Sequence, residues 1–240
     1  MSALAGRVAL VAGASGAIGG AIARRLAERE ARLVLAGRRR ERLDDLARQV
    51  APAPVEVFAG DLGDEAAIAA LAAGSTRVFG ALDLLVHAAG DYLAGDLADT
   101  PAADFDRLYR INLRAPFLLT RACLPALVAR RGQIVFLNSS VTARRGVGLY
   151  AATKLALRGL ADSLRAEVNP AGVRVLSVYP GRTASAMQEG VAAAEGKAYD
   201  PERLMQPDDV ARAIVAALEL PRSAEITDLH LRPMEPPDAG

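Results

Sequence analysis

The sequence predicts an α/β fold in which helices cover both faces of a doubly wound parallel sheet. Short apolar runs alternate with longer amphipathic runs along its 240 residues, as in repeated strand–helix–strand units. Several of the short runs are apolar throughout, which is typical of strands that are covered on both faces. No repeat, low-complexity segment or linker divides the chain. We therefore expect residues 1–240 to form a single domain.

The expected elements follow these runs in order. The apolar runs predict strands at residues 8–12, 33–36, 55–59, 82–87, 133–137, 174–179 and 228–231. The amphipathic runs predict helices at residues 17–30, 40–50, 64–73, 101–130, 150–169 and 207–220, of which the fourth could be broken. Residues 182–206 lack a strong period and predict a loop or short helices around the substrate. The proline-containing end, residues 234–240, predicts a loose tail.

Composition excludes several classes of function. The 29 basic and 28 acidic residues nearly balance, which gives no sign of a nucleic-acid or anionic-membrane partner. Cys123 is the single cysteine and lies in an apolar helical stretch, so we expect a core residue and no disulfide framework or metal cluster. No run reaches the roughly 18 uninterrupted apolar residues that would span a bilayer. A cytoplasmic protein is the expectation.

The chain holds only two lysines, and one of them, Lys154, lies four residues after Tyr150. Residues at this spacing share one face of a helix. A nearby ammonium would lower the pKa of a phenol, which is normally about 10. Lysine is a compact point charge, unlike the planar guanidinium that this chain uses elsewhere. The pair therefore predicts an acid–base site; the alternative is two side chains that merely reach solvent from one helix.

A glycine-rich turn follows the first expected strand and opens the first helix. Glycines let the backbone approach a pyrophosphate, and the amides at a helix N-terminus attract its charge. The required strand–turn–helix context makes a plain turn the weaker alternative. The turn predicts a dinucleotide site formed by Gly13, Ser15, Gly16, Ala17, Ile18 and Gly19.

Arginines end the second expected strand, where an NAD site commonly places a carboxylate for the ribose 2′-hydroxyl. A guanidinium instead suits a 2′-phosphate by charge and geometry. Arg38 and Arg39 therefore favour NADP(H), and NAD(H) is less favoured. Arg39 and Arg40 could equally begin a solvated helix while Arg38 binds the phosphate, and Ser15 is a further candidate for this group.

Together these motifs resemble the short-chain dehydrogenase/reductase family, in its single-domain form, over essentially the whole chain. Gly13 and Gly19 match the family's Thr-Gly-x-x-x-Gly-x-Gly, while Ala12 and Ala17 replace its threonine and middle glycine. The resemblance implies a Rossmann fold of about seven strands in the order 3-2-1-4-5-6-7.

The resemblance also assigns the cofactor loops after the third and fourth strands. Asp61 and Leu62 match an Asp–hydrophobic pair that contacts adenine, although Asp61 or Asp64 could simply cap the next helix. Where the family has Asn-Asn-Ala-Gly, this chain has His87 followed by Ala88, Ala89 and Gly90. We expect the last three to line the cofactor site and His87 to be a structural histidine.

The family's catalytic set maps onto Asn112, Ser140, Tyr150 and Lys154. An Asn inside a helical pattern is locally unfavourable, and the resemblance implies that Asn112 holds a water beside the lysine. Ser140, which precedes Val141, is the preferred serine, and Ser139 is the alternative. The interval from Ser140 to Tyr150 is shorter than in the family by two or three residues, so a tight loop is expected.

After the sixth strand, Pro180 and Gly181 match the motif beside the nicotinamide. Thr183 and Ser185 are both candidates to bind its carboxamide, with a slight preference for Thr183. The resemblance implies that Asn112, Tyr150 and Lys154 belong to the cofactor site as well.

The function implied is an NADP(H)-dependent oxidoreductase that interconverts a carbonyl and an alcohol, with Tyr150 as general acid and base. A homodimer or homotetramer is implied, through the helices that contain Asn112 and Tyr150. A nucleotide-binding regulator or scaffold without turnover is the alternative; an extended-branch epimerase or dehydratase would need more chain after the sixth strand. Arg144, Arg145 and Arg182 could recognise an acidic substrate, but solvated charge is the preferred interpretation.

Overall fold

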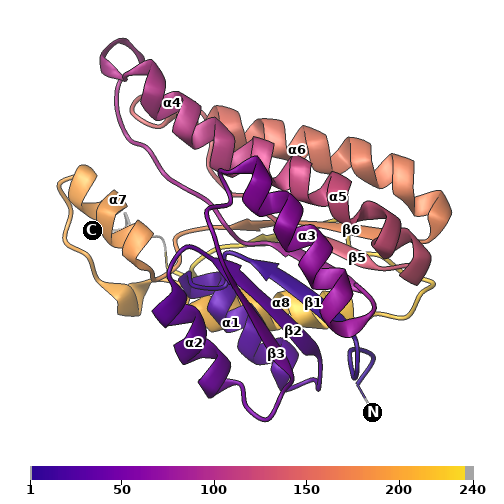
Figure 1. Ribbon diagram of the computed structural model, residues 1–240. Coiled ribbons are helices and arrows are strands. Elements are labelled where there is room, and N and C mark those ends of the chain that lie inside the picture. The colour runs from indigo at the N-terminus through magenta and orange to yellow at the C-terminus, as the bar shows by residue number, and fades with distance from the viewer. Residues whose placement is uncertain (1, 236–240) are drawn as a thin grey trace.

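Seven parallel strands form one sheet in the order β3-β2-β1-β4-β5-β6-β7 (Figure 1). The computed structural model describes residues 2–235. The strands are β1 (Val8–Ala12), β2 (Arg32–Gly37), β3 (Val55–Ala59), β4 (Leu84–His87), β5 (Gln133–Leu137), β6 (Arg174–Pro180) and β7 (Asp228–Leu231). The predicted doubly wound sheet and its strand order are confirmed.

Burial along the strands follows their place in the sheet. Every residue of β1 and β4 is buried, because helices cover both faces of these central strands. The edge strands β3 and β7 are only partly buried. This contrast explains why the central strands read as uninterrupted apolar runs in the sequence.

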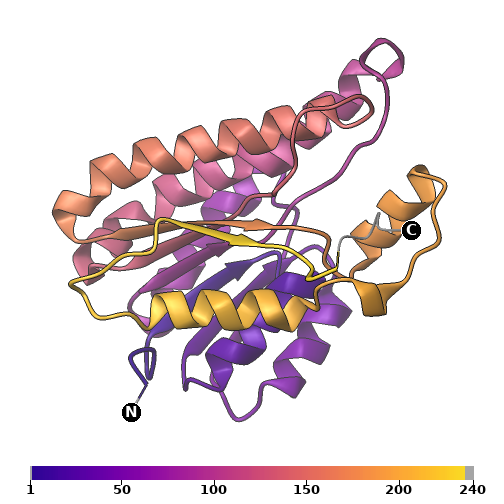
Figure 2. The ribbon, with the colours of Figure 1, turned by 180° about the vertical axis from the view of Figure 1, so that it is seen from behind.

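Two helical layers sandwich the sheet (Figures 1 and 2). One core forms where α1 (Ala17–Ala27), α2 (Arg40–Gln49) and α8 (Pro207–Leu218) pack on the first face. A second core forms where α3 (Glu65–Phe79), α5 (Ala115–Arg130) and α6 (Gly148–Val168) pack on the opposite face. The helical layers leave the carboxyl ends of the strands accessible, and ligands bind at this edge in open α/β sheets.

The long helical run before β5 is broken, as one reading of the sequence allowed. It consists of α4 (Ala102–Tyr109), a π turn (Arg110–Arg114) and α5. By length and composition alone this run could cross a membrane. In the structure its inner face packs into the core through residues such as Leu119 and Cys123, which is typical of a core helix. Burial raises the pKa of the Cys123 thiol to about 12, consistent with the predicted structural role.

Several predicted boundaries differ from the structure, and three of these differences have a clear physical reason. Helix α1 ends at Ala27 rather than at residue 30, because Glu30 adopts a left-handed backbone with φ 60°. Helix α3 continues to Phe79 and stops at Gly80, whose left-handed conformation closes the helix. Strand β4 begins at Leu84, since Asp83 is drawn into polar contacts below the sheet.

The segment at residues 182–206 contains α7 (Ala186–Ala194) and a short 3-10 turn (Pro201–Arg203). Helix α7 stands apart from both helical layers in the two views (Figures 1 and 2). The prediction of short helices here is therefore correct. Met234 is 99% exposed, and the rest of the predicted tail, residues 236–240, lies outside the described residues.

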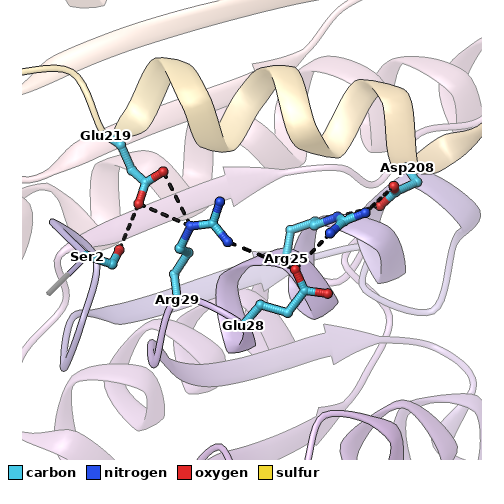
Figure 3. Close-up of polar contacts among 6 residues, drawn as sticks. All are labelled: Ser2, Arg25, Glu28, Arg29, Asp208 and Glu219. Carbon is cyan, nitrogen blue, oxygen red and sulfur yellow. Dashed lines mark hydrogen bonds and ion pairs between the residues drawn. The ribbon is translucent and has the colours of Figure 1, made fainter.

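Charged side chains join α1 to α8 along their outer sides (Figure 3). Arg25 binds Asp208 at the start of α8, and Arg29 binds Glu219 just beyond its end. Glu219 also accepts a hydrogen bond from Ser2 at 2.8 Å. These contacts tie the first helix, which carries the glycine turn, to the last helix of the fold.

Asp83 holds the sheet together at the edge opposite the strands' carboxyl ends. Its carboxylate accepts hydrogen bonds from the Val8 amide at 3.0 Å, from Arg7 at 2.8 Å and from Arg130 at 3.0 Å. Burial alone would raise the pKa of Asp83, but these three donors together lower it below the ordinary value. The ionised carboxylate therefore stabilises the fold.

We predict that Asp83→Asn lowers the free energy of unfolding by about 2 kcal/mol at neutral pH, because an amide cannot accept from all three donors. A depressed folded-state pKa contributes stability above the unfolded pKa of about 4, and this stability is lost as pH falls through the folded value. The difference in the free energy of unfolding between variant and parent should therefore shrink in acid. Urea denaturation at neutral pH and at a pH below the folded-state pKa of Asp83 measures this difference. Asp106→Asn, at an exposed position of α4, is the matched control, and an equal loss for both variants would contradict the prediction.

Candidate active site

A cleft of about 870 Å³ lies along the carboxyl ends of the strands, from the glycine turn to helix α7. Most of the site residues predicted from the sequence line it. These are Ser15, Gly16, Ala17, Ile18, Gly19, Arg39, Ala88, Ala89, Gly90, Ser140, Tyr150, Lys154, Pro180, Gly181, Thr183 and Ser185. The predicted residues that do not line it are Gly13, Arg38, Asp61, Leu62 and Asn112.

The glycine turn is built by close backbone contacts. A Cβ on Gly13, which has φ +92°, would lie 2.3 Å from the Ala89 nitrogen, so only glycine fits against the loop after β4. A Cβ on Gly19 would lie 2.3 Å from the Gly13 carbonyl oxygen. Gly13 therefore shapes the turn from beneath instead of facing the cleft.

The N-terminus of α1 opens into the cleft. Gly16 is its N-cap and supplies no side-chain hydrogen bond, so the first amides of the helix are available to an anion. Ala17, which replaces a family glycine, is exposed and lines the cleft.

Arginines gather at the end of the cleft beside α2. Arg39 and Arg42 line it together with Arg24 from α1, and Arg39 also donates to the Ser15 carbonyl at 2.8 Å. Burial lowers the pKa of Arg39, as do the positive charges of Arg42 and Arg38. The positive charges of neighbouring arginines thus repel one another here and are not fully balanced by carboxylates.

The structure revises which arginine faces this end of the cleft. The sequence allowed Arg38 as the binder and Arg39 as a solvated residue, but Arg39 lines the cleft and Arg38 does not. Arg40 pairs with Asp44 along α2 at 3.0 Å, so the solvated-helix interpretation holds for Arg40. Arg42 was missed; it lies in the first turn of α2, shortly after Arg39, which is the N-cap of that helix.

The loops after β3 and β4 hold their backbone in different ways. Asp61 accepts a hydrogen bond from the Gly63 amide at 2.9 Å, while the side chain of Leu62 is buried in the core. Asp64, not Asp61, caps α3. In the second loop, Ala88 and Ala89 lie directly above the glycine turn.

His87 is a structural residue, as expected. Its Nε2 lies 2.8 Å from the Thr120 hydroxyl, and its ring stacks on Phe136 with centroids 4.8 Å apart. Complete burial lowers the pKa of His87 to about 3. The imidazole is therefore neutral at physiological pH and takes no part in acid–base chemistry.

Tyr150 and Lys154 share one face of α6, and both are buried where they line the cleft. The Lys154 ammonium donates to the Leu137 carbonyl at the end of β5, at 2.8 Å. Burial lowers the pKa of Lys154 to about 8, so the ammonium form still predominates at neutral pH. The carbonyl bond fixes the lysine between the sheet and the first turns of the helix.

The pKa of Tyr150 is raised, which contradicts the lowering expected from its lysine neighbour. Burial raises it most, a hydrogen bond with the Ser139 hydroxyl lowers it, and the nearby Tyr92 raises it further. The Lys154 ammonium donates to the Leu137 carbonyl, which explains why its charge does not determine the pKa of the Tyr150 phenol. The phenol is protonated at neutral pH, and this is the form that a proton donor needs.

Of the two candidate serines, Ser139 is the one whose hydroxyl lowers the pKa of Tyr150, which favours the alternative over the preferred Ser140. The Ser140 side chain is exposed, while its amide donates to the Pro180 carbonyl at 3.1 Å. Ser139 is thus better placed than Ser140 to act together with Tyr150.

The side chain of Asn112 is fully buried and braces the loop after β4. Its carbonyl accepts from the Asp91 amide at 2.8 Å, and its amide donates to the Asp91 carbonyl and to Thr153. Thr153 in turn donates to the Tyr150 carbonyl at 2.8 Å. Asn112 therefore links the loop after β4 to α6 through Thr153, a residue that the sequence analysis did not single out.

Thr183 and Ser185 both line the nicotinamide end that the family motif predicts. The Thr183 hydroxyl donates to the Gly181 carbonyl at 3.1 Å and keeps its acceptor lone pairs. The Ser185 hydroxyl donates to the Thr183 carbonyl and accepts from the Gln188 amide, as the N-cap of α7. The more fully engaged Ser185 supports the slight preference for Thr183.

Comparison with known proteins gives consistent matches over the whole chain. The family of short chain dehydrogenases matches residues 7–196. An uncharacterized short-chain type dehydrogenase/reductase from Sinorhizobium fredii is 36% identical over 94% of this chain and 91% of its own. Uncharacterized oxidoreductases from Staphylococcus aureus are 28% identical over 98% of this chain and 100% of theirs.

Solved structures agree in fold. A metagenomic short-chain oxidoreductase in complex with NADP superposes with a TM-score of 0.85 at 34% identity, over 98% of this chain and 100% of that one. A short chain dehydrogenase from Burkholderia cenocepacia, also in complex with NADP, gives 0.85 at 30% identity, over 95% and 97%. The chain thus belongs to the short-chain dehydrogenase/reductase family of oxidoreductases.

Proposed function

We propose that this protein is an NADP(H)-dependent oxidoreductase that interconverts a ketone or aldehyde with an alcohol. The observation that carries the proposal is a single cleft that has an anion-binding end and an acid–base end. At one end lie an open helix N-terminus and unneutralised arginines, and at the other lie the buried Tyr150 and Lys154 with Ser139. A regulator or scaffold that only binds a nucleotide would not require the residues of the acid–base end.

The residues at the first end fit NADP(H). Gly16 leaves room and free amides for a pyrophosphate, and Arg39 and Arg42 suit the extra phosphate that distinguishes NADP from NAD. The relatives that were solved with NADP bound support this choice. When bound, the dinucleotide supplies or accepts the hydride, while Lys154 holds its ribose and Pro180, Gly181 and Thr183 border its nicotinamide.

The protein's own residues move the proton. The Ser139 and Tyr150 hydroxyls would both bond the oxygen of the carbonyl substrate, where negative charge grows as the carbon is reduced. Tyr150, protonated because burial raises its pKa, then donates its proton to that oxygen. In the reverse direction its phenolate accepts the proton of the alcohol, while the Lys154 ammonium keeps α6 docked on the strand end.

We further propose that the chain forms a homodimer or homotetramer through α5 and α6, with a cytoplasmic location. Large apolar side chains stay exposed on the helices of this layer, which supports such an interface: Phe105, Tyr109, Phe117, Val128 and Leu155. Sedimentation of the intact protein distinguishes the two assemblies.

The first prediction of the proposal concerns Tyr150. We expect Tyr150→Phe to keep NADPH affinity but lose turnover of its carbonyl substrate by about 10²–10⁴-fold, the usual contribution of general acid–base catalysis. A panel of aldehydes, ketones and diketones, with NADPH absorbance as the readout, identifies the substrate for this measurement. An unaffected rate would refute the assignment.

The two neighbouring serines supply a matched control. Ser139→Ala should lower turnover strongly, because it removes the partner of Tyr150, whereas Ser140→Ala should change it little. The opposite order would restore Ser140 as the catalytic serine. NADPH binding without any turnover across the panel would favour the regulator or scaffold.

The second prediction concerns dinucleotide selectivity. Arg39→Ala and Arg42→Ala should each weaken NADPH binding by about tenfold and leave NADH binding nearly unchanged, because charged hydrogen bonds to the extra phosphate are lost. Fluorescence titration of both nucleotides measures this. Arg40→Ala, whose parent residue is paired with Asp44, is the control. Equal losses for NADPH and NADH would contradict the phosphate assignment.

A further inference from the structure

Three charged side chains from separate segments meet at the substrate end of the cleft. Arg182 follows β6, Arg144 lies in the loop before α6, and Glu195 closes α7. The Glu195 carboxylate lies 2.6 Å from an Arg182 nitrogen and 3.3 Å from an Arg144 nitrogen. All three residues line the cleft, so the Glu195 carboxylate binds two guanidinium groups inside it.

These charges lie close to the chemistry. The ring of Tyr92 meets that of Tyr150 edge to face, with centroids 5.1 Å apart. Burial raises the pKa of Tyr92 most; Glu195 also raises it, while Arg144 and Arg182 lower it. All three charges therefore act on the side chain that stands against the proton donor.

The pairing is partly sheltered from solvent. Glu195 and Arg182 are each 21% exposed, whereas Arg144 is 52% exposed. Lys197 lies 3.9 Å from the same carboxylate. A guanidinium left without Glu195 in this setting would be a ready site for a substrate carboxylate. Arg145, in contrast, pairs with Asp96 on the surface and does not line the cleft.

A tethered carboxylate competes well against a free one. Because Glu195 is held beside its partners, its effective concentration is on the order of millimolar or above. A substrate anion would have to displace it and would also meet its negative charge. An uncharged substrate meets neither obstacle.

We propose that Glu195 is a specificity residue that occupies Arg144 and Arg182 and thereby restricts the cleft to uncharged carbonyl compounds. The proposal rests on the oxidoreductase function above and narrows its substrate class. It assigns the two arginines to Glu195, and neither to an acidic substrate nor to solvent alone.

Binding of a small anion tests the proposal without any turnover. Calorimetric titration with benzoate, and with benzamide as the uncharged analogue, compares the parent protein with Glu195→Gln. We expect the variant to bind benzoate about tenfold more tightly, since one competing charge is removed at a partly exposed site, while benzamide affinity changes little. Adding Arg182→Gln to the variant should abolish the gain.

Controls separate this effect from a general change in the structure of α7. Glu189→Gln, on the exposed side of the same helix, should leave benzoate affinity at the parent value. Melting temperature and NADPH affinity report whether Glu195→Gln remains folded. If it does not fold, Glu195→Asp, which keeps the charge but shortens the reach of the carboxylate towards the two guanidinium groups, should show a smaller gain in benzoate affinity.

Turnover extends the test. With para-formylbenzoate and its methyl ester, Glu195→Gln should shift the ratio of kcat/KM towards the acid by about tenfold. Equal benzoate affinity in parent and variant, or a gain that survives the loss of Arg182, would overturn the specificity role. Failure of the parent to reduce any carbonyl compound would instead count against the oxidoreductase function, and the benzoate titration would still decide the role of Glu195.

Discussion

The bond from the buried Lys154 ammonium to the Leu137 carbonyl is the contact on which the active site depends. It joins α6 to the end of β5, and both residues line the cleft. A chain that uses arginine almost throughout places a lysine here because the space admits a compact cation. Burial lowers the pKa of this lysine to about 8, so the position is retained at an electrostatic cost.

Near this contact, polar side chains connect the loop after β4 to α6. Asn112 holds the loop at Asp91 and reaches Thr153, which bonds the Tyr150 carbonyl. The family's asparagine pair after β4 is absent, and Asn112 braces this loop in part instead. The glycine turn meets the same loop from below. A displacement of the glycine turn would therefore be transmitted through this loop to α6, the helix that carries Tyr150.

Much of this arrangement could be predicted from the sequence, because parallel strands and glycine turns leave periodic, local signals. The strand order, the possible interruption of the long helix before β5 and the structural role of His87 all followed from such signals or from the family motifs. The choice between Ser139 and Ser140 could not be made from the sequence, because it depends on how a shortened loop closes in space. The direction of the Tyr150 pKa shift failed because burial and the aim of Lys154 are tertiary properties. For the same reason the pairing of Glu195 with two distant arginines left no trace in the sequence.

Replacing Lys154 by arginine tests the central claim most directly, because the charge is kept while its compact shape is lost. The account predicts that Lys154→Arg loses carbonyl turnover by at least about 10²-fold, close to Lys154→Met, since a guanidinium cannot occupy the buried position beneath the Leu137 carbonyl. Steady-state kinetics on the parent's best substrate measure it. Turnover within a few-fold of the parent would show that positive charge alone suffices, and it would contradict the account.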